Sequence, residues 1–319
     1  MTYRVVDLFA GGGGLSLGFS RAGFEVVCAI EKWQPAIEVY QENFNHPVIN
    51  IDLLDIDKAA SLIKNYAPSL IIGGPPCQDF SSAGKRDESL GRANLTISFA
   101  EIVQKCKPEV FVMENVARAA KSKAFQVALK IFKNAGYGLT IKILNSAYCG
   151  APQLRKRLIV VGKLGEKDSF LEKILEDGLS IEPMTLRQYF NGSLNFEHYY
   201  RHPRSYARRG IFSVDEPSPT IRGVNRPVPK GYLGHSGDPI KVNSNLRSLT
   251  THERAKIQTF PDDFKWVGSK TDIEQVIGNA VPVKLAEYVA SNIRKYLEQK
   301  ENTYIQNQLF QECAKYSAT

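Results

Sequence analysis

The residues best suited to chemistry lie in GGPPCQDFSSAGKR, residues 73 to 86, which follow the apolar run SLIIG. Two prolines fix the backbone φ angle directly before Cys77, and the two glycines before them let the chain turn sharply off a strand. A thiol at the carboxyl end of a sheet strand lies where open α/β folds bind ligands. It acts as a nucleophile if its pKa falls or its proton is removed on attack. A lone cysteine is more often a small buried residue, but the prolines and the polar residues QDFSS favour the reactive interpretation here.

Two further stretches carry ionisable groups at predicted strand ends. Glu114 and Asn115 end the apolar stretch FVMENV. Apolar walls favour the protonated form of a carboxyl group, which can then pass a proton near neutral pH, although a helix N-cap or a salt-bridged surface acid is the commoner role. Arg155 and Arg157 alternate in QLRKRLIVVG, so we expect both on one side of a strand. Two guanidinium groups there could hold an anion or a polar base edge; a solvated edge strand is the alternative.

A glycine-rich turn in DLFAGGGGLSLGF, Asp7 to Phe19, predicts a ligand site at the end of the first strand. Such a turn lets a ligand approach the backbone closely. The dinucleotide spacing G-x-G-x-x-G is not met, because counting from Gly11 the last position is Ser16. Glu31 closes the second predicted strand and could bind ribose hydroxyls. An adenosine-type ligand such as S-adenosylmethionine (SAM) fits better than NAD, although a purely structural turn is about as common.

The elements that position these groups alternate along the first half of the chain. The predicted strands are YRVVDLF, EVVCAI, SLIIG, EVFVMEN, YGLTIKIL and RLIVVG, and the predicted helices include GLSLGFSRAGF, residues 35–43 and ISFAEIVQKC. This alternation predicts an α/β fold with a doubly wound, mostly parallel sheet.

The alternation of predicted strands and helices ends after Gly162, and the chain is rich in Arg, Pro, Gly, Ser and Tyr from about residue 166 to 245. Helical patterns return in LTTHERAKIQTF and VPVKLAEYVASNIRKYLEQK. We therefore expect a catalytic α/β domain at 1–165, a smaller irregular domain at 166–250, and a return to the first domain at 251–319.

Composition describes an ordinary globular chain of 319 residues, 43% hydrophobic and 23% charged. No apolar run approaches the ~18 residues needed to span a membrane, and the N-terminus lacks a secretory signal pattern. The five cysteines form neither a zinc spacing nor a disulfide framework, which predicts no metal site and a reducing cytoplasm. Between Arg187 and Arg247 ten Lys or Arg residues face four Asp or Glu residues, a balance of +6. The segment YYRHPRSYARRG suits contact with phosphates, and a solvated basic surface is an equal alternative.

Taken together, these motifs resemble the DNA (cytosine-5) methyltransferases of bacterial modification systems. The matching blocks occur in the family's order: DLFAGGGGLSLGF, Glu31, IDLLD, GGPPCQDFSSAGKR, ENV, QLRKR, RSLTTHERAKIQTFP and IGNAVP. The core G-P-P-C-Q-x-F-S is highly specific, and the match covers nearly the whole chain apart from the middle basic segment. The resemblance implies a SAM-dependent methyltransferase fold acting on double-stranded DNA.

The resemblance also assigns catalytic roles. Cys77 is implied as the nucleophile that adds to C6 of a cytosine extruded from the duplex, because cytosine C5 is too weakly nucleophilic to take a methyl group directly. Glu114 would supply a proton or hydrogen bond at N3, and Asn115 would help to hold the loop. Arg157 is implied as a base or phosphate contact beside the flipped cytosine, and Arg155 would act similarly.

The cofactor-binding set implied by the resemblance is Asp7, Phe9, Gly11, Gly13, Glu31, Asp52, Leu53, Pro75 and Asn279. Glu31 would bind the ribose, Asp52 the exocyclic amine of adenine and Leu53 its ring, while Asn279 would lie near the methionine end. The chain departs from the family in two places. Lys32 precedes Trp33, so Phe9 is the expected stacking partner of adenine, and His252 stands where the family often has Arg.

The middle segment corresponds in position and charge to the family's target-recognition region. The implied DNA-contacting residues are Gln78, Ser81, Arg155, Thr220, Ile221, Arg222, Asn225 and Arg226. Arg suits guanine and Asn suits adenine, while phosphate contact by the same arginines is equally open. We expect a monomer, with a cognate restriction endonuclease acting separately.

Three alternatives remain at this point. Relatives of the family methylate cytosine in transfer RNA, although the long basic middle segment favours DNA. A non-catalytic DNA- or SAM-binding regulator would not need Cys77, Glu114, Arg155 and Arg157 together. A dinucleotide oxidoreductase is disfavoured by the failed glycine spacing.

Overall fold

A seven-stranded mixed sheet forms the centre of the computed structural model, which describes residues 2–76, 94–203, 205 and 207–316. The strand order is β3-β2-β1-β4-β5-β8-β6. The strands are β1 (Arg4–Leu8), β2 (Glu25–Ile30), β3 (Val48–Ile49), β4 (Leu70–Gly73), β5 (Val110–Val116), β6 (Tyr137–Asn145) and β8 (Lys156–Leu164). The predicted α/β fold with a mostly parallel sheet is confirmed.

One strand runs against the others. β8 pairs antiparallel with both β5 and β6. The chain between β6 and β8 covers only residues 146–155, which is too short for the crossover of a dozen or more residues that parallel neighbours need. β8 therefore returns beside β6 and brings its first residues to the edge where β5 ends.

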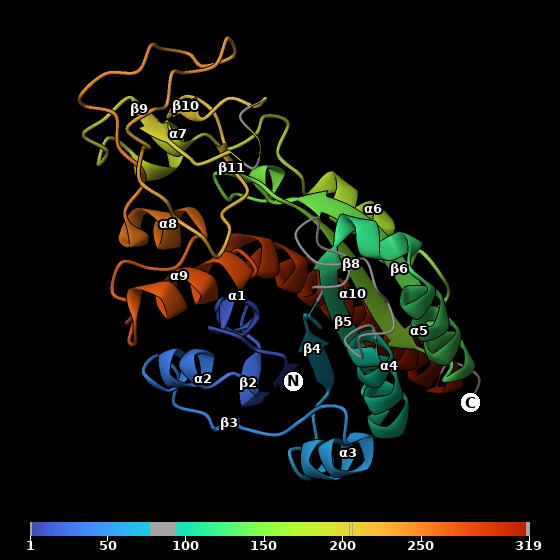
Figure 1. Ribbon diagram of the computed structural model, residues 1–319. Helices are drawn as coiled ribbons and strands as arrows, with labels where there is room; N and C mark the ends of the chain where they lie inside the picture. Colours follow the sequence, from blue (N-terminus) through green and yellow to red (C-terminus); the bar gives the residue numbers. More distant parts are fainter. Residues whose placement is uncertain (1, 77–93, 204, 206, 317–319) are drawn as a thin grey trace.

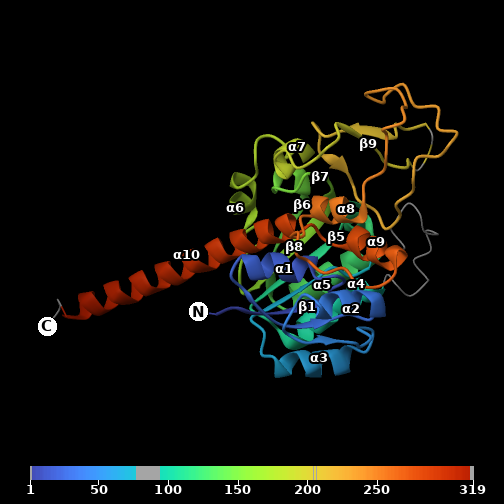
Figure 2. The ribbon, with the colours of Figure 1, turned by 90° about the vertical axis from the view of Figure 1, so that its left-hand side faces the viewer.

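Helices cover both faces of the sheet (Figure 1). They are α1 (Gly14–Arg21), α2 (Gln34–Gln41), α3 (Ile56–Asn65), α4 (Asn94–Cys106), α5 (Lys123–Asn134), α6 (Glu172–Asp177) and α10 (Val283–Tyr316). One hydrophobic cluster joins α1, α6 and α10 to the sheet, and a second joins α3, α4 and α5 to its other face. α10 starts against α1 and extends well beyond the rest of the molecule (Figure 2).

A smaller lobe lies beyond the end of the sheet where β7 (Gln153–Leu154) pairs with β11 (Ser218–Pro219) (Figure 1). It contains the antiparallel pair β9 (His198–Tyr200) and β10 (Ile211–Ser213), with α7 (Leu186–Phe190), α8 (Thr251–Ile257) and α9 (Lys270–Asn279). The buried hydrophobic residues of its main core come from different parts of the chain between Leu186 and Ile277.

This packing divides the chain differently from the predicted boundaries at 165/166 and 250/251. Leu171 and Leu175 belong to the core of the large lobe, whereas Ala255 and Ile257 belong to the core of the small lobe. Within the described residues, no helix is long and apolar enough to cross a membrane, and no group of three or more His, Cys, Asp or Glu residues is placed to hold a metal ion.

Candidate active site

Three of the predicted motifs meet at one edge of the sheet. Leu8 at the end of β1 pairs with Gly73 at the end of β4, and Gly73 pairs with Met113 of β5. Gly73 is needed for this close approach, because a Cβ there would lie 2.5 Å from the carbonyl oxygen of Leu8. The glycine-rich turn, the start of the GGPPC segment and the ENV segment therefore leave the sheet side by side.

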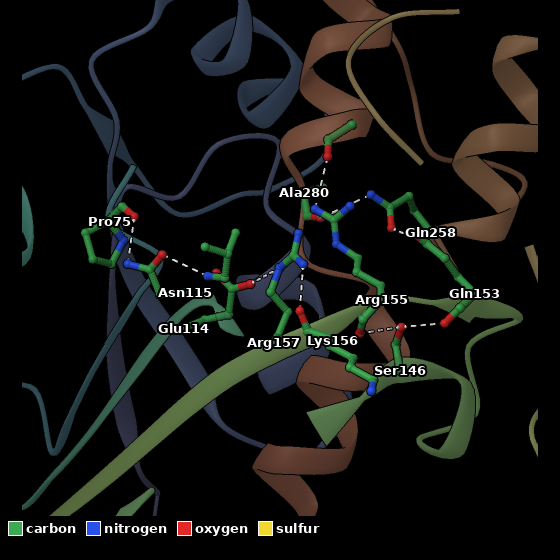
Figure 3. Close-up of polar contacts among 12 residues, drawn as sticks. Pro75, Glu114, Asn115, Ser146, Gln153, Arg155, Lys156, Arg157, Gln258 and Ala280 are labelled. Atoms are coloured by element: carbon green, nitrogen blue, oxygen red, sulfur yellow. Dashed lines mark hydrogen bonds and ion pairs between the residues drawn. The ribbon is translucent and has the colours of Figure 1, made fainter. Parts of the chain in front are cut away.

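Glu114 and Arg157 form a shielded ion pair at this edge (Figure 3). Arg157 Nε lies 2.6 Å from Glu114 Oε1, and the two side chains are only 12% and 10% exposed. Antiparallel pairing of β5 with β8 sets Arg157 opposite Val116, two residues beyond Glu114. The other carboxyl oxygen, Oε2, is directed toward Gly74, where a Cβ would lie 3.0 Å from it. The pair thus adjoins the segment that leads to the candidate nucleophile.

Cys77, Gln78 and Ser81 lie outside the described residues. The described chain reaches Pro76, one residue before Cys77 in the sequence, and Gly74 adjoins Glu114.

Asn115 connects β5 to the segment before the cysteine. Its Nδ2 donates to the carbonyl oxygen of Pro75 at 3.5 Å, and its Oδ1 accepts from the backbone N–H of Val116 at 2.8 Å. Pro75 itself is buried. These contacts connect β5 to the segment that precedes Cys77 in the sequence.

Arg155 has surroundings different from those of Arg157. It is 2% exposed, and its guanidinium donates to three backbone carbonyls: Ile221 O at 2.9 Å, and Gly278 O and Ala280 O at 3.0 Å each (Figure 3). Burial, and then the nearby charge of Arg157, lowers the pKa of Arg155 well below its usual value. The alternation of the two arginines correctly predicted a common direction, but the depth of Arg155 favours a connecting role over contact with DNA.

A buried glutamine pair accompanies Arg155 and was missed in the sequence. Gln153 Nε2 donates to Gln258 Oε1 at 2.8 Å, and Gln153 Oε1 accepts from the backbone N–H of Ile221 at 2.8 Å. Gln258 in turn donates to the carbonyls of Ile277 and Ala280, at 2.5 and 3.1 Å. Together with Arg155, these glutamines tie the sheet to both the small lobe and α9. No local pattern signals such a network, because its partners lie about a hundred residues apart.

In the glycine-rich turn, Gly13 and Gly14 are closely packed against other residues, whereas Gly11 has free space beside its backbone. A Cβ at Gly13 would clash with the Phe44 ring at 2.3 Å, and one at Gly14 would lie 2.3 Å from Val281 O. Gly11 instead has a positive φ of 55° and open space where a Cβ would be. Its N–H donates to Glu31 Oε2 at 2.8 Å. A ligand can therefore approach the backbone at Gly11, directly beside the carboxylate predicted to bind ribose.

Asp7 lies buried beneath this turn. Its Oδ2 accepts from Ser16 Oγ at 2.6 Å, Ser16 Oγ accepts from Tyr40 OH at 2.7 Å, and Tyr40 OH contacts His46 Nε2 at 2.7 Å. Asp7 Oδ1 has no hydrogen-bond partner in the described part of the chain. Burial raises the pKa of Asp7 to about 7, against the opposing effect of the Ser16 hydrogen bonds. Its position is beneath the cofactor turn rather than on its open side.

The remaining cofactor candidates in the first part of the chain follow β1 and β3. Asp52 Oδ2 pairs with Lys32 Nζ at 2.5 Å, and this hydrogen bond lowers the pKa of Asp52. Leu53 is buried, and Phe9 is half-buried with a positive φ of 58°. Trp33 packs against the hydrophobic cluster that contains Phe260 and Val276.

Asn279, at the end of α9, is exposed, and its Oδ1 accepts from Gln275 Nε2 at 2.9 Å. Open space beside the Gly11 backbone, the carboxylates of Glu31 and Asp52, and nearby apolar side chains together fit an adenosine-containing cofactor.

The described residues predicted to contact DNA differ in how far their side chains are already bonded within the protein. Thr220 is half-buried and its Oγ1 donates to Leu154 O at 2.7 Å, while Ile221 is 3% exposed. Asn225 is also committed, since its Nδ2 donates to Leu249 O at 2.8 Å and Glu274 Oε1 at 3.2 Å. Arg222 Nη2 donates to His202 O, while Arg226 is exposed beside the His202 ring. The contacts of Asn225 therefore disfavour the predicted adenine reading.

Arg254 and Glu274 form a buried ion pair that sequence reasoning also missed. They are 4% and 5% exposed, and Arg254 additionally donates to the carbonyl of Arg222. Burial lowers the pKa of Arg254 to about 10. The pair joins α8 to α9 and fixes the segment after β11. In the sequence both residues look like ordinary polar positions of amphipathic helices.

Comparisons with known proteins agree with this arrangement. The family model for C-5 cytosine-specific DNA methylases matches residues 3–295. The chain is 59% identical to the Type II methyltransferase M.HindV of Haemophilus influenzae over 91% of its length and 96% of that protein. It is 55% identical to the Type II methyltransferase M.HgiDI of Herpetosiphon aurantiacus, covering 93% of this chain and 96% of that one.

Solved structures show the same fold at low identity. The Dnmt2 methyltransferase of S. pombe superposes with a TM-score of 0.69 at 20% identity, covering 93% of this chain and 99% of that one. The methyltransferase EhMeth of Entamoeba histolytica gives 0.64 at 19% identity, covering 94% and 99%. With the sheet edge, the Glu114–Arg157 pair and the family match in agreement, the chain belongs to the C-5 cytosine-specific DNA methylase family and is a DNA (cytosine-5)-methyltransferase.

Proposed function

We propose that this enzyme methylates cytosine C5 within a specific sequence of duplex DNA, using SAM, through covalent addition of Cys77 to an extruded base. The observation that carries the proposal is the shielded Glu114–Arg157 pair, which adjoins the segment ending in Cys77. Extrusion is required because C6 is inaccessible inside a duplex, at a cost of a few kcal/mol.

The reaction proceeds by addition and elimination. The Cys77 thiolate forms a bond to C6, and the ring electron pair moves toward N3, which takes a proton or strong hydrogen bond from Glu114. The resulting enamine would attack through C5 and take the methyl group of SAM, whose sulfur would keep the electron pair of the broken bond and leave as S-adenosylhomocysteine. Loss of the C5 proton then returns the electron pair to the C5–C6 bond and expels the thiolate.

Arg157 positions the carboxyl group for this step. Its Nε donates to Glu114 Oε1, which fixes the rotamer of the carboxyl and leaves Oε2 facing the Gly74 side. Its Nη1 also donates to the carbonyl of Lys156 at 2.9 Å. We propose that the remaining guanidinium donors contact the base or a phosphate, because Arg presents five donors in a rigid fork.

SAM supplies the electrophilic methyl group. Glu31 would bind the ribose hydroxyls, Asp52 and Leu53 the adenine, and Phe9 its face, beside the open backbone at Gly11. Lys32 must release Asp52 when the adenine amine binds, since the two now form an ion pair at 2.5 Å. Asp7 and Pro75 would shape the site from behind, and Asn279, at the end of α9, would lie near the methionine end.

Arg155 acts as a positioning residue in this proposal. It joins Ile221 of the small lobe to Gly278 and Ala280 after α9. Since it is two residues from Arg157, it links the placement of the small lobe to the strand that carries the catalytic ion pair.

Two relatives that match more than 90% of this chain are named Type II methyltransferases. We propose the corresponding role here, namely protection of DNA within a restriction–modification system, with a cognate endonuclease acting separately and the methyltransferase working as a monomer.

Methyl transfer from labelled SAM to duplex DNA tests the proposal, with mass spectrometry of the digested DNA to identify the modified atom. The wild-type protein should yield 5-methylcytosine, and Cys77→Ala should yield none while still binding the duplex. Transfer by the Cys77→Ala protein would contradict the mechanism. Modification of transfer RNA but not of duplex DNA would contradict the substrate.

A further inference from the structure

A small cationic pocket lies on the lobe proposed to recognise DNA, outside the catalytic edge. It is formed by the end of β9 and the segment after β11, and its charged lining is Arg201, His202, Arg222, Arg226 and Arg254. Its volume is about 20 Å³, enough for one oxygen-sized group. No Asp or Glu is among the described residues that line it. A site of this size and charge favours an anion that inserts a single oxygen.

The walls of the pocket are fixed by bonds between its two segments. Arg201 Nη2 donates to Thr220 O at 2.8 Å, and Arg222 Nη2 donates to His202 O at 2.5 Å. Arg254 donates to the carbonyl of Arg222 from beneath, while its own charge is paired with Glu274. The rim is therefore held in place before any ligand arrives, which reduces the entropy lost on binding.

Two nitrogen-bearing side chains converge at the mouth. Arg226 Nη1 lies 3.5 Å from His202 Nε2, and His202 Nδ1 contacts Tyr200 OH at 3.1 Å. Arg226 is exposed and has no carboxylate partner among the described residues. Burial and the nearby charges of Arg226 and Arg222 lower the pKa of His202, which favours the neutral ring. With Nδ1 accepting from Tyr200 OH, the Nε2–H of that ring and the guanidinium of Arg226, which has only donors, can each donate to an acceptor oxygen placed between them.

We propose that His202 and Arg226 bind one backbone phosphate of duplex DNA, with Arg201 and Arg222 holding the rim. This inference rests on the proposed action on duplex DNA. A phosphate fits better than a base edge, because base edges combine donors and acceptors and the amide of Asn225 is already bonded to Leu249 and Glu274. The contact would set the register of the small lobe on the duplex without itself reading sequence.

The pocket also adjoins one of the hydrogen bonds that Arg155 makes between the sheet and the small lobe. Ile221, which lines it, accepts the hydrogen bond from Arg155. A phosphate held here therefore positions the same segment that is tied, through Arg155, to the strand carrying Arg157.

The test replaces single phosphates by neutral methylphosphonates along a duplex that the wild-type enzyme methylates. Dissociation constants are measured by fluorescence anisotropy for the wild type and for Arg226→Gln. The matched control is Arg208→Gln, which removes an exposed arginine of the same lobe that does not line the pocket. We expect one phosphate whose neutralisation weakens wild-type binding about tenfold, the size of one charge-assisted contact, and weakens Arg226→Gln binding by less than twofold.

His202→Gln should reduce the effect of the same methylphosphonate, whereas Arg208→Gln should leave it at about tenfold. The slope of log K against log salt should also become shallower by about 0.9 in Arg226→Gln. Additive losses at every phosphate, or a changed methylated sequence in Arg226→Gln with no phosphate coupling, would overturn the proposal. These outcomes concern binding alone, so they remain distinguishable from a failure of methyl transfer by the wild type.

Discussion

Replacing Arg155 by methionine tests the connecting role of this buried arginine. Methionine keeps an unbranched chain of similar reach but removes every donor. The substitution leaves three carbonyls without their present partner: those of Ile221, Gly278 and Ala280. These bonds act together with those of Gln153 and Gln258, which also connect to Ile221 and Ala280.

The size of the effect follows from two opposing terms. Ala280 O keeps its hydrogen bond from Gln258; an unsatisfied buried carbonyl costs about 1–3 kcal/mol, so those of Ile221 and Gly278 would together cost roughly 2–6 kcal/mol. Removing a guanidinium that is 2% exposed recovers part of the several kcal/mol spent on desolvating its charge. We expect a net loss in the lower half of that range in the free energy of unfolding, and about half of that loss for Arg155→Lys, which keeps the charge and some of the bonds.

Urea unfolding followed by circular dichroism measures these values. Arg208→Met is the matched control, because Arg208 is exposed and its loss should change stability by no more than about 0.5 kcal/mol. Stability of Arg155→Met within about 1 kcal/mol of the wild type would refute the connecting role. Equal losses in Arg155→Lys and Arg155→Met would show that the hydrogen bonds contribute little.

Three further perturbations follow from the structure. The pKa of Asp7 is raised to about 7 in the folded protein, whereas in the unfolded chain it has its ordinary value of about 4. The folded protein therefore keeps a proton that the unfolded chain loses, and the free energy of unfolding should fall by up to about 4 kcal/mol as the pH rises from about 4 to 7. Urea titrations across this range should show a flatter slope for Asp7→Asn. Arg254→Met should cost about 3–5 kcal/mol because it leaves Glu274 charged and buried, while the double variant Arg254→Met/Glu274→Leu should recover most of that loss in the same assay; equal losses would contradict the pairing. Gly14→Ala should lower the melting temperature by several degrees, because its Cβ would lie 2.3 Å from Val281 O, and an unchanged melting temperature would show that α1 can shift away.

Much of the large lobe could be predicted from the sequence, because its strands are short apolar runs buried on both faces. Runs such as EVVCAI and LIIG became β2 and β4 at nearly the predicted positions. The alternation of Arg155 and Arg157 predicted their common direction, since side-chain direction depends on local geometry. Their different depths depend on Ile221 and Ala280, which are distant in sequence and carry no local signal.

The small lobe was less predictable because it too depends on contacts between residues that are distant in the sequence. Its strands have two or three residues each, too few for a periodic pattern, and its core takes residues from α8 and α9 as well as from the middle segment. Asn225 illustrates the consequence for function. Its residue type suggested a contact with adenine, whereas its amide holds Leu249 and Glu274 together.

Covalent trapping tests the central claim most directly. A pool of random duplexes containing 5-fluorocytosine in place of cytosine is incubated with SAM and the protein, then denatured. Fluorine at C5 cannot leave as a proton does, so the account predicts a protein–DNA complex that survives denaturation, requires SAM, and is absent with Cys77→Ala. The trapped DNA would also reveal the recognised sequence. A stable complex with Cys77→Ala, or no complex from a wild-type preparation that methylates ordinary cytosine, would contradict the proposed covalent mechanism.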